Sequence, residues 1–462
     1  MLHIDNNVQT ISETLACYSS TLQFVDLPAE VISHARWAIL DTMGVALGGI
    51  GSKEGKALLA ALKDFGSGSQ ATIWGTAARA TAPIAALVNG TAAHVLELDD
   101  IGNGHKGSVV VPASLAVAEA QGADGRQVLT AVVAGYEVAA RILHGIGGYI
   151  VHNGQGWHST GTVGSFGAAA AASYLLGLNA RETASALGIA GSFTGGIWAF
   201  IADGAMTKRL HPGKSAENGI VAAYLARQGF SGPRAILEAD WGGFFNTYNP
   251  GQGDPALTLS GLGKEFHILR CGFKRHACCA GIHSALDALS LLMDQHGLTK
   301  NEIDHIQVLS SPYLLRQLGK KDIQTTCDAQ LSLPYSLAAA LVSGGCTGPE
   351  QFTQERINDS EIRAWMRRIT MAPDERIEPD GPHVVKISLQ NGMVVEGRVP
   401  VFKGRAQNPL TQEEIEDKFN ALAGRVFSKD TVKQVCDLIL GLERLNHIDE
   451  LTRYLVLDGN IL

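Results

Sequence analysis

The sequence predicts a mainly α-helical protein, in which a smaller α+β lid domain is inserted before the C-terminal helices of a large helical-bundle domain. Three observations predict this fold. Apolar residues recur with the 3.6-residue period of helices through about the first 265 residues, and alternating, β-branched runs follow. Amphipathic helical patterns then return at about residue 401. We therefore expect a helical domain of residues 1–265 plus 401–462 and a lid domain of residues 266–400.

Helix signals in the first part of the chain begin with residues 29–49, which follow Pro28 and end in a glycine pair. The other helix-periodic segments expected in this part are 82–98, 109–122, 125–148, 160–179 and 215–230. Segment 160–179 consists almost entirely of small residues, so we place it at the centre, where helix backbones approach closely. The uncharged stretch 183–202 is long enough to span a bilayer, but it contains four glycines. We expect a buried helix pair broken at Gly195–Gly196 there, rather than a membrane span.

The later part of the chain mixes strands with helices. Residues 304–311 are β-branched, and residues 383–400 hold two alternating runs joined by Asn391–Gly392, which is typical of a type I′ hairpin. Helical patterns are expected at 280–297, 333–345 and 411–455. In a two-domain protein of this kind, the cleft between the domains is the expected ligand site.

Composition excludes several classes of partner. The chain has 462 residues, 45% of them hydrophobic, and a formal net charge of −8, which disfavours nucleic acid or an anionic membrane as the main partner. Seven cysteines, with no CxxC pair among them, indicate reduced thiols. The N-terminal residues carry acids and no apolar run typical of a signal peptide. We therefore expect a cytoplasmic protein.

Familiar cofactor and metal motifs are missing from the sequence. It contains no GxSxG, HExxH or GxxxxGK pattern, and no strand precedes its one glycine-rich GTVGSFG run. Cys279 and His283 are spaced i, i+4 and could share a metal, but no third ligand stands at a supporting spacing. We predict neither a cofactor nor a metal.

Four polar clusters interrupt the apolar pattern, each beside glycine and small-residue helices. They lie at residues 96–108, 153–164, 203–219 and 273–288. Glycine lets a backbone approach a ligand closely. We expect the four clusters to converge around one small anion. Each histidine or acid could instead serve only as a helix cap or a buried structural group.

The motifs in these clusters resemble the MmgE/PrpD family, whose members include 2-methylcitrate dehydratase, cis-aconitate decarboxylase and iminodisuccinate epimerase. The resemblance rests on AAHVLELDDIGNGHKGSVVVPASLAVAEA, GWHSTGTVGSFGAAAAASYLLGL, GAMTKRLHPGKSAENGIVAAYLARQGFSGP and DAQLSLPYSLAAAL. It implies a cofactor-independent, two-domain, homodimeric enzyme that acts on a small di- or tricarboxylate.

Roles for individual side chains follow from the resemblance together with their chemistry. The residues expected in catalysis are His105, Lys208, His158, Asp100, Asp99, Tyr335 and His283. Those expected to bind substrate are Lys274, Arg209, Arg275, Glu97 and Cys279. Arginine suits carboxylates because its planar fork donates two parallel hydrogen bonds.

The expected chemistry is proton abstraction from a carbon beside a carboxylate. His105 is suited to the role of base at neutral pH, and Lys208 could donate a proton or stabilise the enolate. The family's acidic loop commonly reads Asp-Phe-Asp-Asp-Thr, whereas this chain has Ile101 in place of the threonine. This departure favours epimerisation as the outcome. Two alternatives stay open: a lyase of the dehydratase or decarboxylase type, and a non-catalytic polycarboxylate-binding protein.

Overall fold

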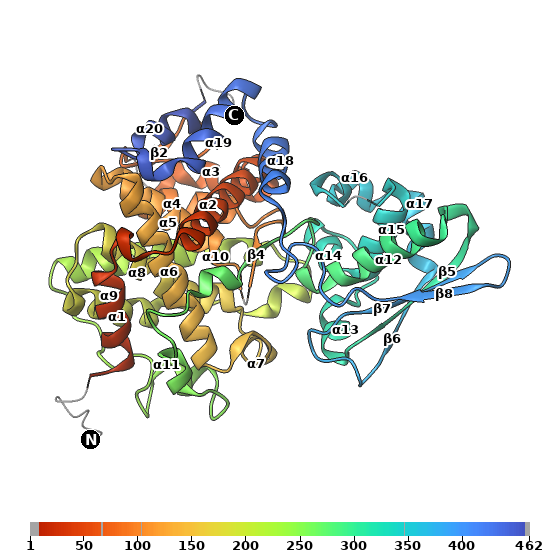
Figure 1. Cartoon of the computed structure of the whole chain (residues 1–462), viewed down its shortest axis with the longest axis horizontal. Helices are drawn as coiled ribbons and strands as arrows, with labels where there is room; N and C mark the ends of the chain where they lie inside the picture. The colour runs from red at the N-terminus through yellow and green to blue at the C-terminus, as the bar shows by residue number, and fades with distance from the viewer. Residues whose placement is uncertain (1–8, 66–67, 103, 346, 458–462) are drawn as a thin grey trace.

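The computed structural model describes residues 9–65, 68–102, 104–345 and 347–457. It has two lobes, which Figure 1 shows side by side: a large helical lobe that holds both ends of the chain, and a smaller lobe built from its later part. Helices dominate the described chain, and the strands are few and short. The predicted fold class is therefore confirmed.

The helical lobe consists of two groups of helices separated in sequence by the smaller lobe. The first group is α1 (Ile11–Thr21), α2 (Ala29–Gly49), α3 (Lys53–Phe65), α4 (Ala82–Ala92), α5 (Gly107–Gln121), α6 (Gly125–Gly145), α7 (Gly148–Gly154), α8 (Ser159–Leu175), α9 (Ala180–Phe193), α10 (Thr207–Arg227) and α11 (Phe244–Tyr248). The second is α18 (Gln412–Ala423), α19 (Lys429–Leu440) and α20 (Asp449–Thr452). Short strand pairs join β1 (Ala71–Thr72) to β2 (Arg79–Ala80) and β3 (Asp100–Ile101) to β4 (Gly272–Phe273).

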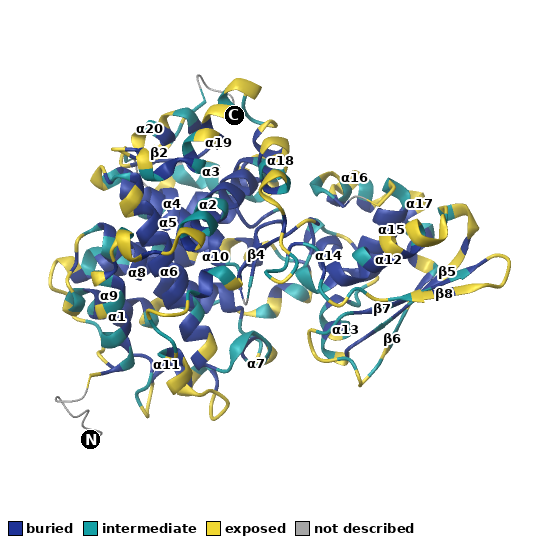
Figure 2. Cartoon of the chain, in the orientation of Figure 1, coloured by how far each residue is buried: buried dark blue, intermediate teal, exposed yellow. Residues whose placement is uncertain are grey.

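Small residues allow the central helices to approach closely. A Cβ atom added to Gly135 of α6 would lie 2.8 Å from the carbonyl oxygen of Gly167 in α8, and one added to Gly167 would lie 2.7 Å from the oxygen of Gly135. Between α4 and α10, a Cβ atom at Gly90 would lie 2.9 Å from the Cα atom of Gly213. Figure 2 shows these central helices almost entirely buried. The expectation that the small-residue segment lies at the centre is confirmed.

The smaller lobe packs helices against one four-stranded sheet. Its helices are α12 (His283–His296), α13 (Pro312–Leu318), α14 (Thr326–Gln330), α15 (Leu333–Ser343), α16 (Gln354–Ile357) and α17 (Ser360–Arg367). The sheet has the order β6-β5-β7-β8, with β5 (Ile303–Ser310), β6 (Ile369–Pro373), β7 (Val384–Leu389) and β8 (Val394–Gly397). The β7–β8 hairpin turns at Asn391 and Gly392 as predicted, but the predicted type I′ turn is wrong, because Gly392 has a positive φ and Asn391 does not. Strand β6, parallel to β5, was not predicted because its sequence does not alternate.

Two predicted segments differ from the observed helices. The helix expected at 215–230 starts earlier than predicted: α10 begins at Thr207 and accommodates Pro212 inside the helix at the loss of one backbone hydrogen bond. The helix pair expected in residues 183–202 consists of α9 and only a short 3-10 helix, Trp198–Ile201. The break falls at Thr194, whose backbone is extended, just before Gly195–Gly196.

Buried residues form two separate clusters. One draws on residues between 15 and 273 and between 410 and 455, whereas the other lies mainly between residues 277 and 395. In the described chain, α6 alone is long and apolar enough to cross a membrane, and 89% of its apolar window is buried inside the protein. The six cysteines with described positions are free thiols. The seventh, Cys346, lies outside the described residues.

We predict that Gly167→Ala lowers the free energy of unfolding by about 1–3 kcal/mol, because the new methyl group would meet the backbone of α6 in an already packed core. Urea or thermal unfolding measures the effect. Gly154→Ala is the matched control, since a Cβ atom there meets nothing within 4 Å. Equal stability of the two variants would contradict the close-approach argument.

Candidate active site

A buried glutamate, Glu97, lies at the centre of the candidate site. Helix α4 ends at Ala92, and the turn that follows places Glu97 in the left-handed backbone region, with φ of 51°. It is the one non-glycine residue with positive φ in the described chain, and such conformations concentrate at functional sites. Its side chain is fully buried. The surrounding structure must therefore hold this strained turn in place.

Three cations from two distant segments surround the Glu97 carboxylate. Lys208 and Arg209, in the first turn of α10, both contact its Oε1 atom. The Nζ atom of Lys274, just after β4, lies 3.0 Å from Oε2 and also donates to the Glu97 carbonyl oxygen at 2.9 Å. Burial alone would raise the pKa of Glu97, but the charges of Lys208, Lys274 and Arg209 hold that pKa well below its usual value. Glu97 is therefore ionised and fully paired.

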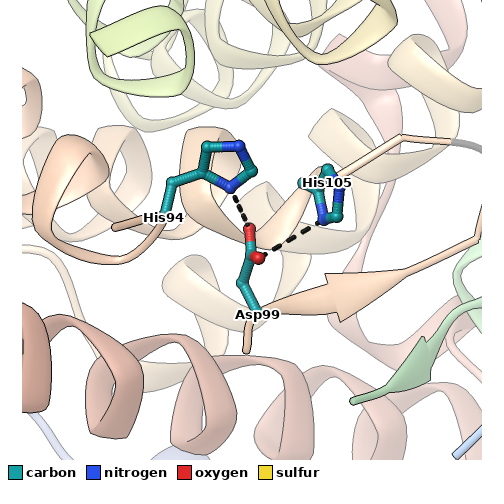
Figure 3. A group of neighbouring side chains, drawn as sticks. All are labelled: His94, Asp99 and His105. Carbon is teal, nitrogen blue, oxygen red and sulfur yellow. Dashed lines mark hydrogen bonds and ion pairs between the residues drawn. The ribbon is translucent and has the colours of Figure 1, made fainter. Parts of the chain in front are cut away.

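Next to this cluster, Asp99 joins two histidines (Figure 3). One carboxylate oxygen lies 2.7 Å from Nδ1 of His94, and the other lies 3.4 Å from Nδ1 of His105. Burial opposes ionisation of Asp99, but its contacts with His105, His94 and Lys274, including the hydrogen bond from His94, lower its pKa below the ordinary value. An ionised Asp99 can only accept, so Nδ1 of His94 carries the proton.

The backbone fixes the tautomer of His105. Its Nδ1 atom lies 2.7 Å from the carbonyl oxygen of Asp100, and a carbonyl can only accept a hydrogen bond. Nδ1 therefore carries the proton, and Nε2 is the nitrogen left with a free lone pair. Burial lowers the pKa of His105 to about 3 against the opposing charge of Asp99. His105 is thus a neutral imidazole at neutral pH, which is the form a general base requires.

The neighbouring Asp100 has the opposite character. It accepts hydrogen bonds from the Gly107 amide and the Tyr136 hydroxyl, each at 3.0 Å. Burial and the charge of Asp99 raise the pKa of Asp100 to about 7. Two adjacent carboxyl groups thus have well-separated pKa values. Such separation is typical of acid–base sites.

The C-terminal helix α18 fixes the two polar segments relative to one another. Nζ of Lys418 donates to the carbonyl oxygens of Leu98 at 2.5 Å and Lys274 at 2.9 Å, and it pairs with Asp41 Oδ1 at 2.5 Å. The backbone that carries Glu97 and the backbone that carries Lys274 are therefore joined by one ammonium group.

A pocket of about 520 Å³ opens between the two lobes, and His105 is on its wall. The other polar residues that line it come from both lobes and from the segment that returns from β8 to α18. They include Tyr149, Arg270, Cys279, Ser284, Tyr313, Gln317, Asp380, Arg405 and Gln407. Ile101 also lines the pocket. The predicted position of the site, in the cleft between the lobes, matches this geometry.

A second pair of histidines lies behind the pocket wall. His158 caps the N-terminus of α8, and its Nδ1 atom lies 2.9 Å from Nδ1 of His211 in α10. Its ring centroid is 6.0 Å from that of His94. Burial and the charges of His211 and Lys208 lower the pKa of His158 well below its usual value. His158 thus adjoins the His94–Asp99–His105 group without lining the pocket.

Coordinating atoms of His94, Asp99 and His105 all lie within 4.8 Å of one another, a spacing that a divalent cation could use. The surroundings disfavour such an ion. The Lys274 ammonium already lies 3.8 Å from Asp99 Oδ1, and Lys208 and Arg209 add two further positive charges nearby. The three side chains are therefore better suited to exchanging protons than to holding a divalent cation.

Most of the predicted residues converge, but with different partners from those expected. The residues that meet in this centre are Glu97, Asp99, Asp100, His105, His158, Lys208, Arg209 and Lys274. Arg209 and Lys274 were expected to hold substrate carboxylates, but both instead form ion pairs with Glu97, and Arg209 also donates a hydrogen bond to Gln330. The reason is electrostatic, because a buried carboxylate without partners would be strongly unfavourable. Cys279 lines the pocket as a thiol whose pKa is raised by burial.

Three predicted residues lie elsewhere. Tyr335 is buried in the smaller lobe, where its hydroxyl donates to the Gln351 carbonyl at 2.7 Å. His283 begins α12 and is buried against Phe402, with Nε2 3.4 Å from the Cys278 carbonyl oxygen. Arg275 is exposed, because successive residues of an extended segment point to opposite sides and Lys274 points inward.

The prediction missed His94, Tyr149 and Tyr313. His94 had a signal in the sequence, since it is one imidazole in an otherwise apolar helical run, five residues before Asp99. Tyr149 and Tyr313 line the pocket from opposite lobes. Only the packing of the lobes brings these two tyrosines together, so no local pattern could have identified them.

Comparison with known proteins agrees with this geometry. The MmgE/PrpD N-terminal domain model matches residues 13–255, and the MmgE/PrpD C-terminal domain model matches residues 276–442. The chain is 30% identical to cis-aconitate decarboxylase of Homo sapiens, with 97% of this chain and 95% of that protein covered. It is 28% identical to cis-aconitate decarboxylase of Aspergillus terreus (98% and 97% covered). It is 29% identical to a cis-aconitate decarboxylase-like protein of Aspergillus oryzae (96% of each).

We predict that Asp100→Asn changes how stability depends on pH. A carboxyl group with a raised pKa stabilises the fold fully below its unfolded value of 3.8, and this contribution is lost as pH rises to about 7. The Asp100→Asn variant has no carboxyl group at this position, so its stability does not fall with pH for this reason. The free energy of unfolding of the variant, relative to that of the wild type, should therefore rise by up to about 1.4 kcal/mol per pH unit between pH 4 and 7. Above pH 7 the difference should stay constant. Urea titrations across this range measure the difference, with exposed Asp240→Asn as control. A difference that stays constant with pH would contradict the assignment.

We also predict that Glu97→Gln lowers the free energy of unfolding by about 3–5 kcal/mol, because three buried cations would lose their counter-charge. Thermal or chemical unfolding measures this loss. The control is Glu265→Gln, which removes an exposed ion pair with Arg270 and should cost less than about 1 kcal/mol. Similar losses for the two variants would show that Glu97 is not the electrostatic centre.

Proposed function

This chain belongs to the MmgE/PrpD family, and on that premise we propose that it is a cofactor-independent lyase acting on a small unsaturated di- or tricarboxylate. The observation that carries the proposal is the state of His105. Its Nδ1 proton is held by the Asp100 carbonyl, so Nε2 remains for a substrate in the pocket that His105 lines. That nitrogen can give a proton to a carbon atom or take one from it.

Charge around His105 suits an anionic substrate. Lys208, Arg209 and Lys274 carry three positive charges against the two negative charges of Glu97 and Asp99, which leaves an excess of one positive charge behind the pocket wall. Arg270 and Arg405 line the pocket itself. Such an excess in a desolvated site stabilises charge that develops on a substrate carboxylate during reaction.

The relatives support a lyase over the epimerase that the loss of the threonine had favoured. Those named above are cis-aconitate decarboxylases or like them, so the expectation of an isomerase has no support from them. We therefore propose decarboxylation of a β,γ-unsaturated carboxylate of the cis-aconitate type as the leading reaction. Ile101 offers no hydroxyl to the pocket. The part of the substrate that contacts it should therefore be apolar.

The reaction can be written with balanced atoms and charges. The bond between the saturated carbon and its carboxylate breaks, carbon dioxide leaves, and the electron pair forms a new double bond. The electrons of the original double bond then take up a proton at its far carbon, and His105 Nε2 supplies that proton. A bound polyanion raises the pKa of a nearby imidazole, so substrate binding would load His105 with the proton that the reaction consumes.

Incubation of the protein with cis-aconitate in deuterium oxide tests the proposal by NMR. We expect release of carbon dioxide and one deuterium on a product carbon, without added metal or cofactor and in the presence of a chelator. A panel of saturated and hydroxylated di- and tricarboxylates extends the test. Exchange with inversion would instead identify an epimerase, and binding with no exchange on any acid would identify a binding protein.

We predict that His105→Gln lowers kcat by about a hundredfold or more, which is the usual contribution of an acid–base group. Steady-state kinetics on the substrate found above measures the loss. His447→Gln, at an exposed position in the C-terminal part, should leave kcat unchanged. Retention of most of the activity in His105→Gln would move the proton-transfer role to another residue.

A further inference from the structure

Four imidazoles form a row that begins at the pocket and ends at His211 in α10. Successive ring centroids lie 4.8 Å apart for His105 and His94, 6.0 Å for His94 and His158, and 5.1 Å for His158 and His211. His94 and His158 are buried, whereas His105 reaches the pocket and His211 is partly exposed outside it. Only the two ends of the row therefore meet solvent.

We propose that His211 acts through His158 as the group that resupplies protons to this row from solvent, by a route separate from the pocket mouth. The inference rests on the proposed function, because a decarboxylase consumes one proton in every turnover. His211 is thus a positioning and proton-transfer partner that does not itself touch the substrate.

The contact between His158 and His211 has the geometry of proton transfer. Their Nδ1 atoms lie 2.9 Å apart, so one ring donates and the other accepts. Burial lowers the pKa of His211 to about 4 and that of His158 well below its usual value, with Lys208 adding to both shifts. Both rings are then neutral at pH 7. A neutral imidazole has one donor and one acceptor nitrogen, which a group that passes protons requires.

The surroundings fix the two rings relative to one another and shield His158 from solvent. The Gly196 carbonyl accepts the His158 backbone N–H at 3.0 Å, and a Cβ atom at Gly196 would lie 3.2 Å from Nδ1 of His211. Gly196 also has φ of 123°, which favours glycine. The rings of Trp198 and Phe200 meet the His158 ring edge-on at centroid distances of 5.7 and 6.0 Å. This loop therefore leaves space for His211 and shields His158.

Between His158 and His105, His94 is able to receive a proton. Its Nδ1 atom donates a hydrogen bond to Asp99, and its Nε2 atom is buried without a hydrogen-bond partner among the described residues. A buried hydrogen-bond acceptor without a donor is unfavourable. A proton that resides on this nitrogen for part of the time would remove that cost. The ionised Asp99 also attracts positive charge inward.

Protons and charges balance along the row. One proton binds to Nε2 of His211 from water, and the proton between the two Nδ1 atoms shifts to His158. One proton then leaves His158 toward His94 and His105, and one proton ends on the substrate carbon. Each turnover takes one proton from solvent and leaves both rings neutral, with no oxidation or reduction, and with the remaining protons on Nε2 of His211 and Nδ1 of His158. Rotation of the two rings then restores the starting tautomers before the next turnover.

Chemical rescue of His211→Ala tests the inference on the intact protein. We expect kcat to fall roughly tenfold to a hundredfold with KM nearly unchanged, and to rise again with the concentration of added imidazole. Imidazole should not raise the kcat of the wild type. The control His305→Ala, at an exposed position of the smaller lobe, should behave like the wild type.

His211→Gln is the second variant, because it preserves a side chain of similar size but cannot relay a proton. We expect it to lose kcat to a similar extent and to show a larger solvent deuterium isotope effect than the wild type. It keeps the inference testable if His211→Ala does not fold.

Full activity of both variants at all pH values would overturn the inference and leave the lyase standing. A loss of activity that imidazole does not restore, and that brings no larger isotope effect, would also overturn the inference. His211 would then contribute by packing alone. Absence of turnover by the wild type on every acid would overturn the proposed function first, and the proton supply with it.

Discussion

The site depends on one buried carboxylate. Glu97 is fully buried and held in a strained turn, and three cations from two distant segments compensate its charge. A buried charge is tolerable only when such partners are all present. Glu97 therefore joins the end of α4, the start of α10 and the segment after β4, and the remaining acid–base groups take their positions from this junction.

Close packing of small residues brings the necessary helix ends together. Glycine contacts between α6 and α8 and between α4 and α10 place the N-termini of α8 and α10 beside the end of α4. His158, Lys208 and His211 all lie at those N-termini, and His94 lies just after α4. The apolar core and the polar centre are thus parts of one arrangement, since bulkier core residues would separate the groups that must exchange protons.

Sequence reasoning recovered the helical class, the hairpin and the convergence of the polar clusters, because each leaves a local signal in period, turn chemistry or composition. The sequence did not predict which side chains from distant segments would pair with one another. No local pattern could show that Glu97 would take Arg209 and Lys274 as its own partners. Tyr335 looked functional in its motif, yet its hydroxyl is satisfied by a carbonyl of the smaller lobe. Strand β6 was missed because it is defined by its parallel partner more than by its own residues.

Lys418 gives the chain a particular order of assembly. The acidic loop and the segment after β4 are synthesised early and midway, whereas the ammonium that joins their backbones belongs to α18, near the end of the chain. During synthesis from the N-terminus the two segments lack this link until α18 has been made and has packed against them. The polar centre therefore depends on late folding of the helical lobe, after the smaller lobe has been synthesised.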